Sequence, residues 1–270
     1  MVILMLWGLL GLAQGARPAR GELPSDAINQ YIAEFNSAGW EARSSAFYEL
    51  LKLGSGDRSY VARPVHDIIE RASPAEAERL KLELIKLLEK ENKVVQGYKR
   101  SGGHFGEDYS NYYGDVIAAV TALRDPRSMK ALLGATETGG MAVDTLASFA
   151  PISLPPIIET LSDKDQQVRM SALWVLQAMM RPENYDNVKQ YRAEIKRAFL
   201  QAARDPDPGV RSAAATGLGL LGDPDVIPVL EKLAQDDPAC LPERADDGGN
   251  LCPVRMWARR ALANIRSTTK

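Results

Sequence analysis

Apolar residues recur along this chain at the spacing of an α-helix, and prolines and glycines interrupt that spacing. The clearest stretch lies within 205–224, where spacings of four, four and three place four apolar residues on one helical face: Val210, Ala214, Leu218 and Leu221. Asp207 is a favourable N-cap, and Pro208 suits the first helical position because that position needs no N–H donor. Gly222 suits the end of the helix. We therefore predict one helix with a breaker at each end.

The same frame occurs four times along the chain. It consists of an apolar residue followed directly by Arg, with Ala four positions and Leu eight positions after the apolar residue. Its arginines are Arg43, Arg169, Arg211 and Arg255, and the last three copies start 42 and 44 residues apart. A period near 40 residues is typical of stacked helix pairs. The sequence thus predicts an all-α fold, an α-solenoid of stacked antiparallel helix pairs. Each repeated Arg is expected to reach a carbonyl or an acidic cap of the adjacent unit.

The motif Asp-Pro-x-Val-Arg-x-x-Ala-x-x-x-Leu followed by Gly-Asp-Pro resembles the HEAT repeats, specifically the HEAT-like type named after phycobilisome lyases. The resemblance is sharp over 163–266 and weaker over 39–163. It implies a right-handed superhelix that presents a concave protein-binding surface, and it does not imply an enzyme. Related enzymes that bind iron use several His-Glu pairs, whereas this chain has only His66 and His104, followed by Asp67 and Phe105. The sequence therefore predicts no cofactor and no metal site.

Composition divides the chain into five segments. We predict a signal peptide at 1–15, a flexible lead-in at 16–25, N-terminal helical repeats at 26–94, a glycine-rich loop insertion at 95–108 and a C-terminal HEAT-like array at 109–270. Within 74–94 the Glu and Lys residues alternate along what we interpret as a solvated outer helix face. Within the C-terminal array, one long helix is expected from about Glu183 to Ala203.

The N-terminus favours export. Residues 2–12 are almost continuously apolar and are followed by small residues at 13 and 15, which suits cleavage before Ala16. The run is too short to span a bilayer of roughly 30 Å, so no membrane span is expected after cleavage. It is not preceded by Lys or Arg, which departs from a standard signal and leaves a misplaced start, an uncleaved anchor or a simple tail as alternatives. The expected location is periplasmic or secreted.

The two cysteines, Cys240 and Cys252, lie twelve residues apart in one polar stretch. An even count in an exported chain favours a disulfide. Two free thiols or half of a metal site are the alternatives, and zinc is disfavoured because the nearest histidine is distant in sequence.

The most specific candidate for binding is the segment 95–113, which combines aromatic and cationic side chains with four glycines. Its candidate residues are Tyr98, Lys99, Arg100, His104, Phe105, Tyr109 and Tyr113. Long loops often carry function, and Tyr is enriched at interfaces. An unspecific surface loop is the plainer interpretation, since polar glycine-rich segments are commonly only flexible.

Asp-x-Asp pairs occur at 163/165, 205/207 and 223/225, in the expected turns between helices. Calcium binding is one interpretation. N-capping together with contacts to the repeated arginines is favoured, because N-caps prefer Asp and no twelve-residue EF-hand loop is present.

The net charge of −2 opposes nucleic-acid binding, which usually needs a clearly basic domain. Together these observations predict an exported, non-catalytic scaffold that binds an unidentified protein partner on its concave helical face. The alternative function is a ligand-binding or enzyme-accessory protein that acts through residues 95–113.

Overall fold

A computed structural model describes residues 21, 23–24, 26–54, 61–103, 105–136, 140–240 and 251–268, and in these residues every regular element is helical. The first part of the chain contains α1 (Asn29–Glu34), α2 (Trp40–Leu51), α3 (Ala62–Arg71), α4 (Pro74–Arg100), α5 (Glu107–Ala122), η1 (Pro126–Ser128) and α6 (Met129–Ala135). The middle contains α7 (Gly140–Ser148), α8 (Leu154–Thr160), α9 (Gln166–Met179), α10 (Pro182–Val188), η2 (Lys189–Tyr191) and α11 (Arg192–Ala202). The last part contains α12 (Pro208–Leu221), η3 (Pro224–Val226), α13 (Ile227–Asp236) and α14 (Pro253–Thr268).

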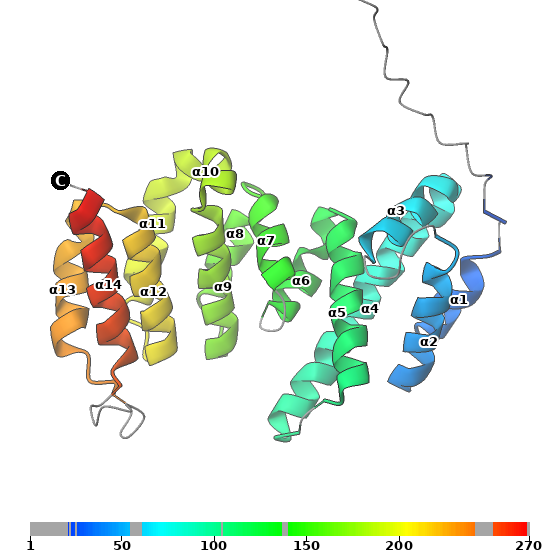
Figure 1. The fold of residues 1–270 in the computed structure, drawn as a ribbon, viewed down its shortest axis with the longest axis horizontal. Coiled ribbons are helices and arrows are strands. Elements are labelled where there is room, and N and C mark those ends of the chain that lie inside the picture. Colours follow the sequence, from blue (N-terminus) through cyan, green and yellow to red (C-terminus); the bar gives the residue numbers. More distant parts are fainter. Residues whose placement is uncertain are drawn as a thin grey trace, which may run out of the picture.

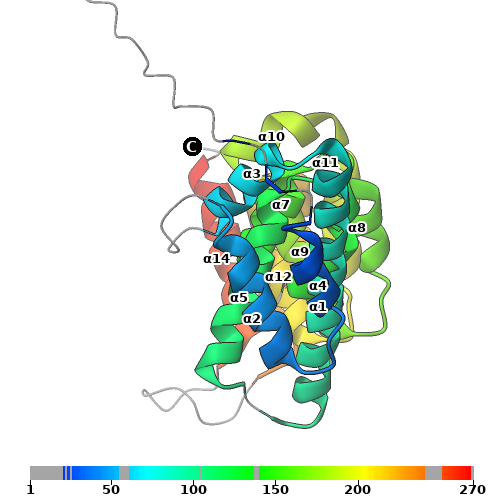
Figure 2. The same ribbon diagram turned by 90° about the vertical axis from the view of Figure 1, so that its right-hand side faces the viewer.

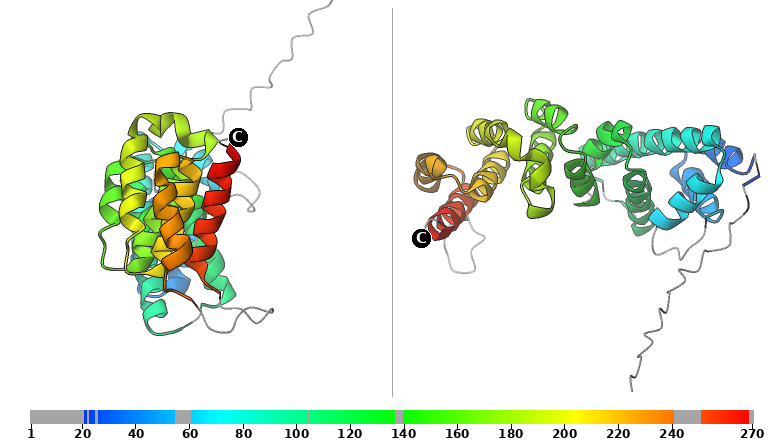
Figure 3. Two further views of the ribbon diagram at one scale, coloured as in Figure 1. Left: turned by 90° about the vertical axis from the view of Figure 1, so that its left-hand side faces the viewer. Right: turned by 90° about the horizontal axis from the view of Figure 1, so that it is seen from above.

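The helices form an elongated array of two layers (Figure 1). The inner row consists of α2, α3, α5, α7, α9, α12 and α14, and the outer row consists of α1, α4, α6, α8, α10–α11 and α13 (Figures 2 and 3). The two rows are joined by antiparallel helix pairs such as α4–α5, α8–α9 and α13–α14. Neighbouring helices within the inner row also contact one another. Seen from above, the array arches gently, with the inner row on the concave side (Figure 3). The predicted all-α solenoid is confirmed.

Helix α12 begins and ends as its sequence predicts. The Asp207 carboxylate accepts a hydrogen bond from the Val210 N–H at 3.0 Å, Pro208 occupies the first turn, and Gly222 ends the helix in the left-handed region at φ 71°. Only glycine adopts that conformation without strain. Val210, Leu218 and the other predicted stripe residues of α12 are buried in the core.

Two glycines let α12 approach its neighbours closely. A Cβ on Gly219 would lie 2.7 Å from the Ala261 Cβ on α14, and one on Gly217 would lie 2.2 Å from the Phe199 ring on α11. Both distances are far below van der Waals contact. The small residues of this repeat therefore serve the stacking of helices rather than a ligand.

Two predicted boundaries are wrong. The expected long helix 183–203 is broken at η2 into α10 and α11. Arg192 bridges this break, because its guanidinium donates to the Tyr185 hydroxyl at 3.2 Å and to Asp223 at 2.5 Å. No Gly or Pro marks the break, so the helical pattern could not show it.

The glycine-rich loop is also shorter than predicted, because α4 continues to Arg100 and α5 begins at Glu107. Within the predicted flexible lead-in, Leu23 is buried and its N–H donates to the Arg71 carbonyl at 3.1 Å. The lead-in is therefore tied to α3 at this point. The predicted signal peptide, 1–15, lies outside the described residues.

Candidate functional site

The repeated arginines join each unit to the next in one geometry. Arg169 on α9 donates to both carboxylate oxygens of Asp205 at 2.8 and 2.7 Å, and its third nitrogen donates to the carbonyls of Asp163 and Lys164. Arg211 on α12 repeats this one unit later. It binds both oxygens of Asp237 at 2.7 and 3.0 Å, and its third nitrogen reaches carbonyls six and five residues before it. Bidentate Arg–carboxylate pairs fix orientation as well as distance.

The acidic partners of these arginines are held in the ionised form. Burial by itself raises the pKa of Asp205, but the hydrogen bonds from Arg169 and the Asp207 N–H, together with the charges of Arg169 and Arg211, hold that pKa below its ordinary value. The pKa of Asp237 is lowered in the same way against burial by Arg211. Arg255 completes the series by donating to the Asp237 carbonyl at 2.7 Å. For Arg169, Arg211 and Arg255 the expected contact with a carbonyl or an acidic residue at the turn of an adjacent unit is present.

The Asp-x-Asp pairs are used in the same turns. Asp165 and Asp207 accept backbone N–H bonds at the starts of α9 and α12, and Asp223 pairs with Arg192 and Lys196. Among the described residues, no group of three His, Cys, Asp or Glu side chains is placed to hold a metal ion. The geometry is that of caps and inter-helix ion pairs.

The first copy of the frame has a different acidic partner. Arg43 on α2 donates to Glu91 on α4 at 2.5 and 3.0 Å, and to the carbonyls of Ser37 and Ala38. The same carboxylate accepts hydrogen bonds from the hydroxyls of Tyr109 and Tyr112 at 2.9 and 3.1 Å. Burial and the adjacent charge of Glu91 raise the pKa of both tyrosines well above the ordinary value, so they stay protonated and donate.

Glu91 contradicts the interpretation of residues 74–94 as having all their charges on an outer face. Its side chain is fully buried. The signal for this was available, because Glu91 follows the buried leucines of α4 at helical spacing: Leu80, Leu84, Leu87 and Leu88. The predominance of Glu and Lys around it obscured its position on the inward stripe.

The residues proposed as a binding loop are divided by the structure. Tyr109 and Tyr113 are each only 4% exposed, so they form core rather than a mobile surface. The Tyr113 hydroxyl donates to Asn92 at 2.6 Å, and Phe105 stacks on Tyr109 with ring centroids 5.0 Å apart. Tyr98 is 42% exposed and packs against Phe105 at 4.8 Å.

Lys99 and Arg100 lie in the last turn of α4, where cations interact favourably with the helix dipole. His104 lies outside the described residues. The expectation of a continuous mobile loop over 95–113 is therefore wrong for its aromatic part, because these rings pack between α4 and α5.

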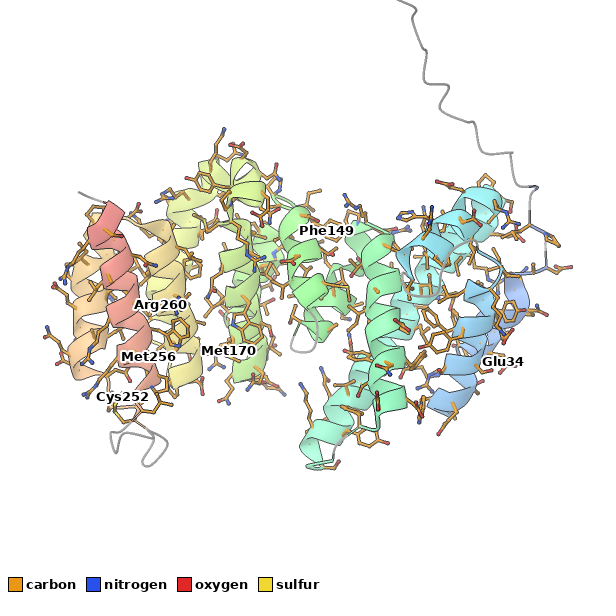
Figure 4. The ribbon with its side chains drawn as sticks, viewed as in Figure 1. Glu34, Phe149, Met170, Cys252, Met256 and Arg260 are labelled. Atoms are coloured by element: carbon orange, nitrogen blue, oxygen red, sulfur yellow. A yellow bond between two sulfur atoms is a disulfide. The ribbon has the colours of Figure 1, made fainter. Side chains whose placement is uncertain are left out.

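Cys240 and Cys252 form the predicted disulfide, with their Cα atoms 4.0 Å apart. The bond joins the chain after α13 to the residue before α14 (Figure 4). It tethers the last inner-row helix to the array at the same end as the Arg255 contact.

The candidate site suggested by the shape of the molecule is a groove on the inner row, between α2, α3 and α5. Two cavities of about 620 and 470 Å³ adjoin there and share Ser45 and Tyr48. We call them together the N-terminal groove. The larger cavity is lined by Ser45, Tyr48, Glu49, Leu51, Lys52, Gly54, Val61, Pro64 and Asp115. The smaller one is lined by Trp40, Glu41, Ser44, Ser45, Tyr48, Asp108 and Asn111.

The aromatic wall of this groove, Trp40 and Tyr48, is held in place by contacts with residues of α5. The Tyr48 hydroxyl donates to Asp115 at 2.8 Å, and burial together with that carboxylate raises the pKa of Tyr48 well above its ordinary value. Trp40 packs edge-on against Tyr109 with centroids 5.3 Å apart. The buried Tyr109–Glu91 cluster therefore supports the groove. The groove is not visible in the sequence, because its residues come from three helices and those of α5 lie far along the chain from those of α2 and α3.

Models of known families match two parts of the chain. The model described as HEAT repeat matches residues 154–181, and the model described as HEAT repeats matches residues 187–245. The chain contains HEAT repeats. The matched residues include the Arg169 and Arg211 units, whose ion pairs link consecutive HEAT repeats. The matches together cover less than half of the chain, and they do not distinguish the phycobilisome-lyase subtype.

Solved structures similar to this chain include designed armadillo repeat proteins and other engineered proteins. One engineered protein, a structural-genomics target, has 18% identity and a TM-score of 0.44, with 89% of this chain and 96% of that chain covered. A designed armadillo repeat protein in complex with the peptide (KR)4 has 16% identity and a TM-score of 0.43, covering 88% and 99%. Both TM-scores lie below 0.5, so the fold assignment rests on the helix arrangement described above. No curated protein matches the sequence significantly.

Proposed function

We propose that this protein is an exported, non-catalytic scaffold that binds a protein partner on its inner row. The observation that carries the proposal is the continuous inner row of stacked helices, which contains the N-terminal groove at one end. Repeat arrays present extended surfaces of this kind to partners. The side chains of the groove offer carboxylates, hydroxyls and aromatic rings, which suit binding.

The inner row also carries apolar side chains near its other end. Met170 lies on α9 and Met256 on α14, and both lie toward the face shown in Figure 4. Met256 is 45% exposed, and Leu220 on the intervening helix α12 is 49% exposed. Exposed methionine adapts to varied partner shapes. These residues support a binding surface that extends along the row beyond the groove.

Export is supported by two observations. The apolar run at 2–12 ends in small residues suited to cleavage, and a disulfide persists most readily in an oxidising compartment. Among the described residues, no helix is long and apolar enough to cross a membrane. N-terminal sequencing of the protein recovered from the exported fraction is expected to start at Ala16. Recovery of an intact N-terminus in the cytosol would contradict export.

Photo-crosslinking with p-benzoylphenylalanine tests the binding face. The reagent is placed at Ser44 and Met256 on the inner row, and at Glu159 on the outer-row helix α8. We expect one and the same partner to crosslink to the inner-row positions and not to Glu159. Equal crosslinking from both faces, or none from the inner row, would refute the scaffold function.

A further inference from the structure

The N-terminal groove is acidic along its whole lining. Its smaller cavity contains the carboxylates of Glu41 and Asp108, and its larger cavity contains those of Glu49 and Asp115. Among the described residues that line the two cavities, Lys52 is the single cation, and its ammonium pairs with Glu49 within α2. Every part of the groove therefore carries an excess of negative charge.

The two acidic pairs are separated along the helices. Glu41 and Glu49 lie eight residues apart on α2, which corresponds to about 12 Å along the axis. Asp108 and Asp115 lie seven residues apart on α5, or roughly 10 Å. In an extended peptide, residues four apart lie on the same side and are about 13 Å from each other. Two basic side chains at that spacing match the two acidic pairs.

The walls between the acidic pairs suit the rest of such a segment. Trp40 and Tyr48 offer aromatic rings, over which a guanidinium binds favourably. Ser44, Ser45 and Asn111 offer polar groups for a peptide backbone. Leu51, Val61 and Pro64 add apolar surface at the larger cavity, against which the carbon chain of a long basic side chain can pack.

We propose that the N-terminal groove binds an extended segment of a partner protein that carries two basic side chains four residues apart. This inference rests on the proposed scaffold function and adds the chemistry of the partner. The position of the groove between α2 and α5, the two acidic pairs and the aromatic wall carry it together.

The direct test is fluorescence anisotropy with the full-length protein and the labelled peptide GSRSGSRSG. The matched peptides are GSESGSESG, which reverses the charge, and GSRRGSGSG, which keeps both arginines but places them side by side. We expect the first peptide to bind most tightly and the glutamate peptide not to bind. Because the contacts are electrostatic, raising NaCl from about 0.05 to 0.5 M is expected to weaken binding severalfold. Binding that ignores arginine spacing, charge or salt would overturn the proposal.

The double variant Glu41→Gln/Asp108→Asn removes one acidic pair from largely exposed positions. It is expected to weaken the first peptide about threefold to tenfold, as loss of two exposed ion pairs does. The control is Glu159→Gln/Asp186→Asn, which removes the same charges from α8 and α10. Equal weakening by both variants would overturn the proposal. The salt and peptide-spacing measurements use the wild-type protein, so they test the proposal even if a variant folds poorly.

Two further outcomes separate the alternatives. If free spermine binds as tightly as the peptide and abolishes its spacing preference, the groove takes a soluble polycation and the proposal fails. If an inner-row partner crosslinks at Ser44 while the arginine peptides show no preference, the scaffold function stands and this inference fails. If the peptide binds the groove while no partner crosslinks to the inner row, the peptide specificity stands and the proposed function fails.

Discussion

Arg43 on α2 donates two hydrogen bonds to Glu91 on α4, and the two side chains are 1% and 0% exposed. Burial by itself lowers the pKa of Arg43, but the hydrogen bonds and charge of Glu91 outweigh it and raise that pKa above the ordinary value. Tyr109 and Tyr112 complete the coordination of the carboxylate. A buried charge pair of this kind holds α2, α4 and α5 in one arrangement behind the N-terminal groove.

Glu91→Gln is expected to destabilise the protein by about 3–5 kcal/mol, because it leaves the Arg43 guanidinium buried without a countercharge. Urea denaturation measures this change. The control is Glu78→Gln, which breaks the exposed ion pair with Arg127 and is expected to have a much smaller effect. Similar effects of Glu91→Gln and Glu78→Gln would contradict the role of this pair.

The ion pairs of Asp205 and Asp237 predict a dependence of stability on pH. The pKa of each carboxyl is lower in the folded protein than the ordinary value of about 3.9, so the unfolded chain binds protons first. Their stabilisation is therefore complete above about pH 4 and is lost as the pH falls through the lower folded-state pKa.

Asp205→Asn should therefore be less stable than the wild type at pH 7, and the difference should shrink below pH 4. Urea midpoints at pH 7, 5 and 3 measure it. Asp163→Asn is the matched control, because the Asp163 carboxylate accepts a backbone N–H from Asp165 at the corresponding turn. In the described part of the chain no arginine donates to that carboxylate. A larger loss from the Asp163 variant than from the Asp205 variant would refute the stabilising role of the Arg169–Asp205 ion pair.

Gly219→Ala is expected to destabilise the protein by about 1–3 kcal/mol, since the added Cβ meets Ala261 and forces α12 from α14. Gly114→Ala on α5 is the matched control, because its Cβ meets nothing within 4 Å. That substitution should raise stability by up to about 1 kcal/mol through helix propensity. Thermal unfolding of the two variants measures both the expected loss and the expected gain of stability. A stabilising Gly219→Ala would disprove the close packing.

Removal of the disulfide by Cys240→Ser/Cys252→Ser should loosen α14 most, because the bond tethers the chain just before that helix. The chain-entropy model gives a loss of roughly 3 kcal/mol for a loop of this length. Hydrogen exchange is expected to speed up in α14 and to stay unchanged in α5. Intact mass of the oxidised wild type should show no alkylated thiol, and two alkylated cysteines would contradict the bond.

The N-terminal half shows how a correct local pattern can still misplace a site. Residues 95–113 have the composition of a mobile recognition loop, yet Tyr109 and Tyr113 fall on the inward face of α5 and donate hydrogen bonds to Glu91 and Asn92. Helical spacing assigns side chains to faces within one helix. It does not say which face of a helix packs against which neighbouring helix, because each of these helices is amphipathic.

The sequence by itself determined the repeat, the caps and the stacking residues of this protein. These depend on contacts a few residues apart, as with Asp207 and Val210, or on a motif repeated at a fixed distance, as with Arg169 and Arg211. Only the tertiary structure decided the buried partner of Arg43, the break between α10 and α11, and the N-terminal groove. Each of these brings together groups from separate helices, as with Tyr48 and Asp115, which are 67 residues apart. Their proximity follows from how the helices pack, and no local pattern encodes it.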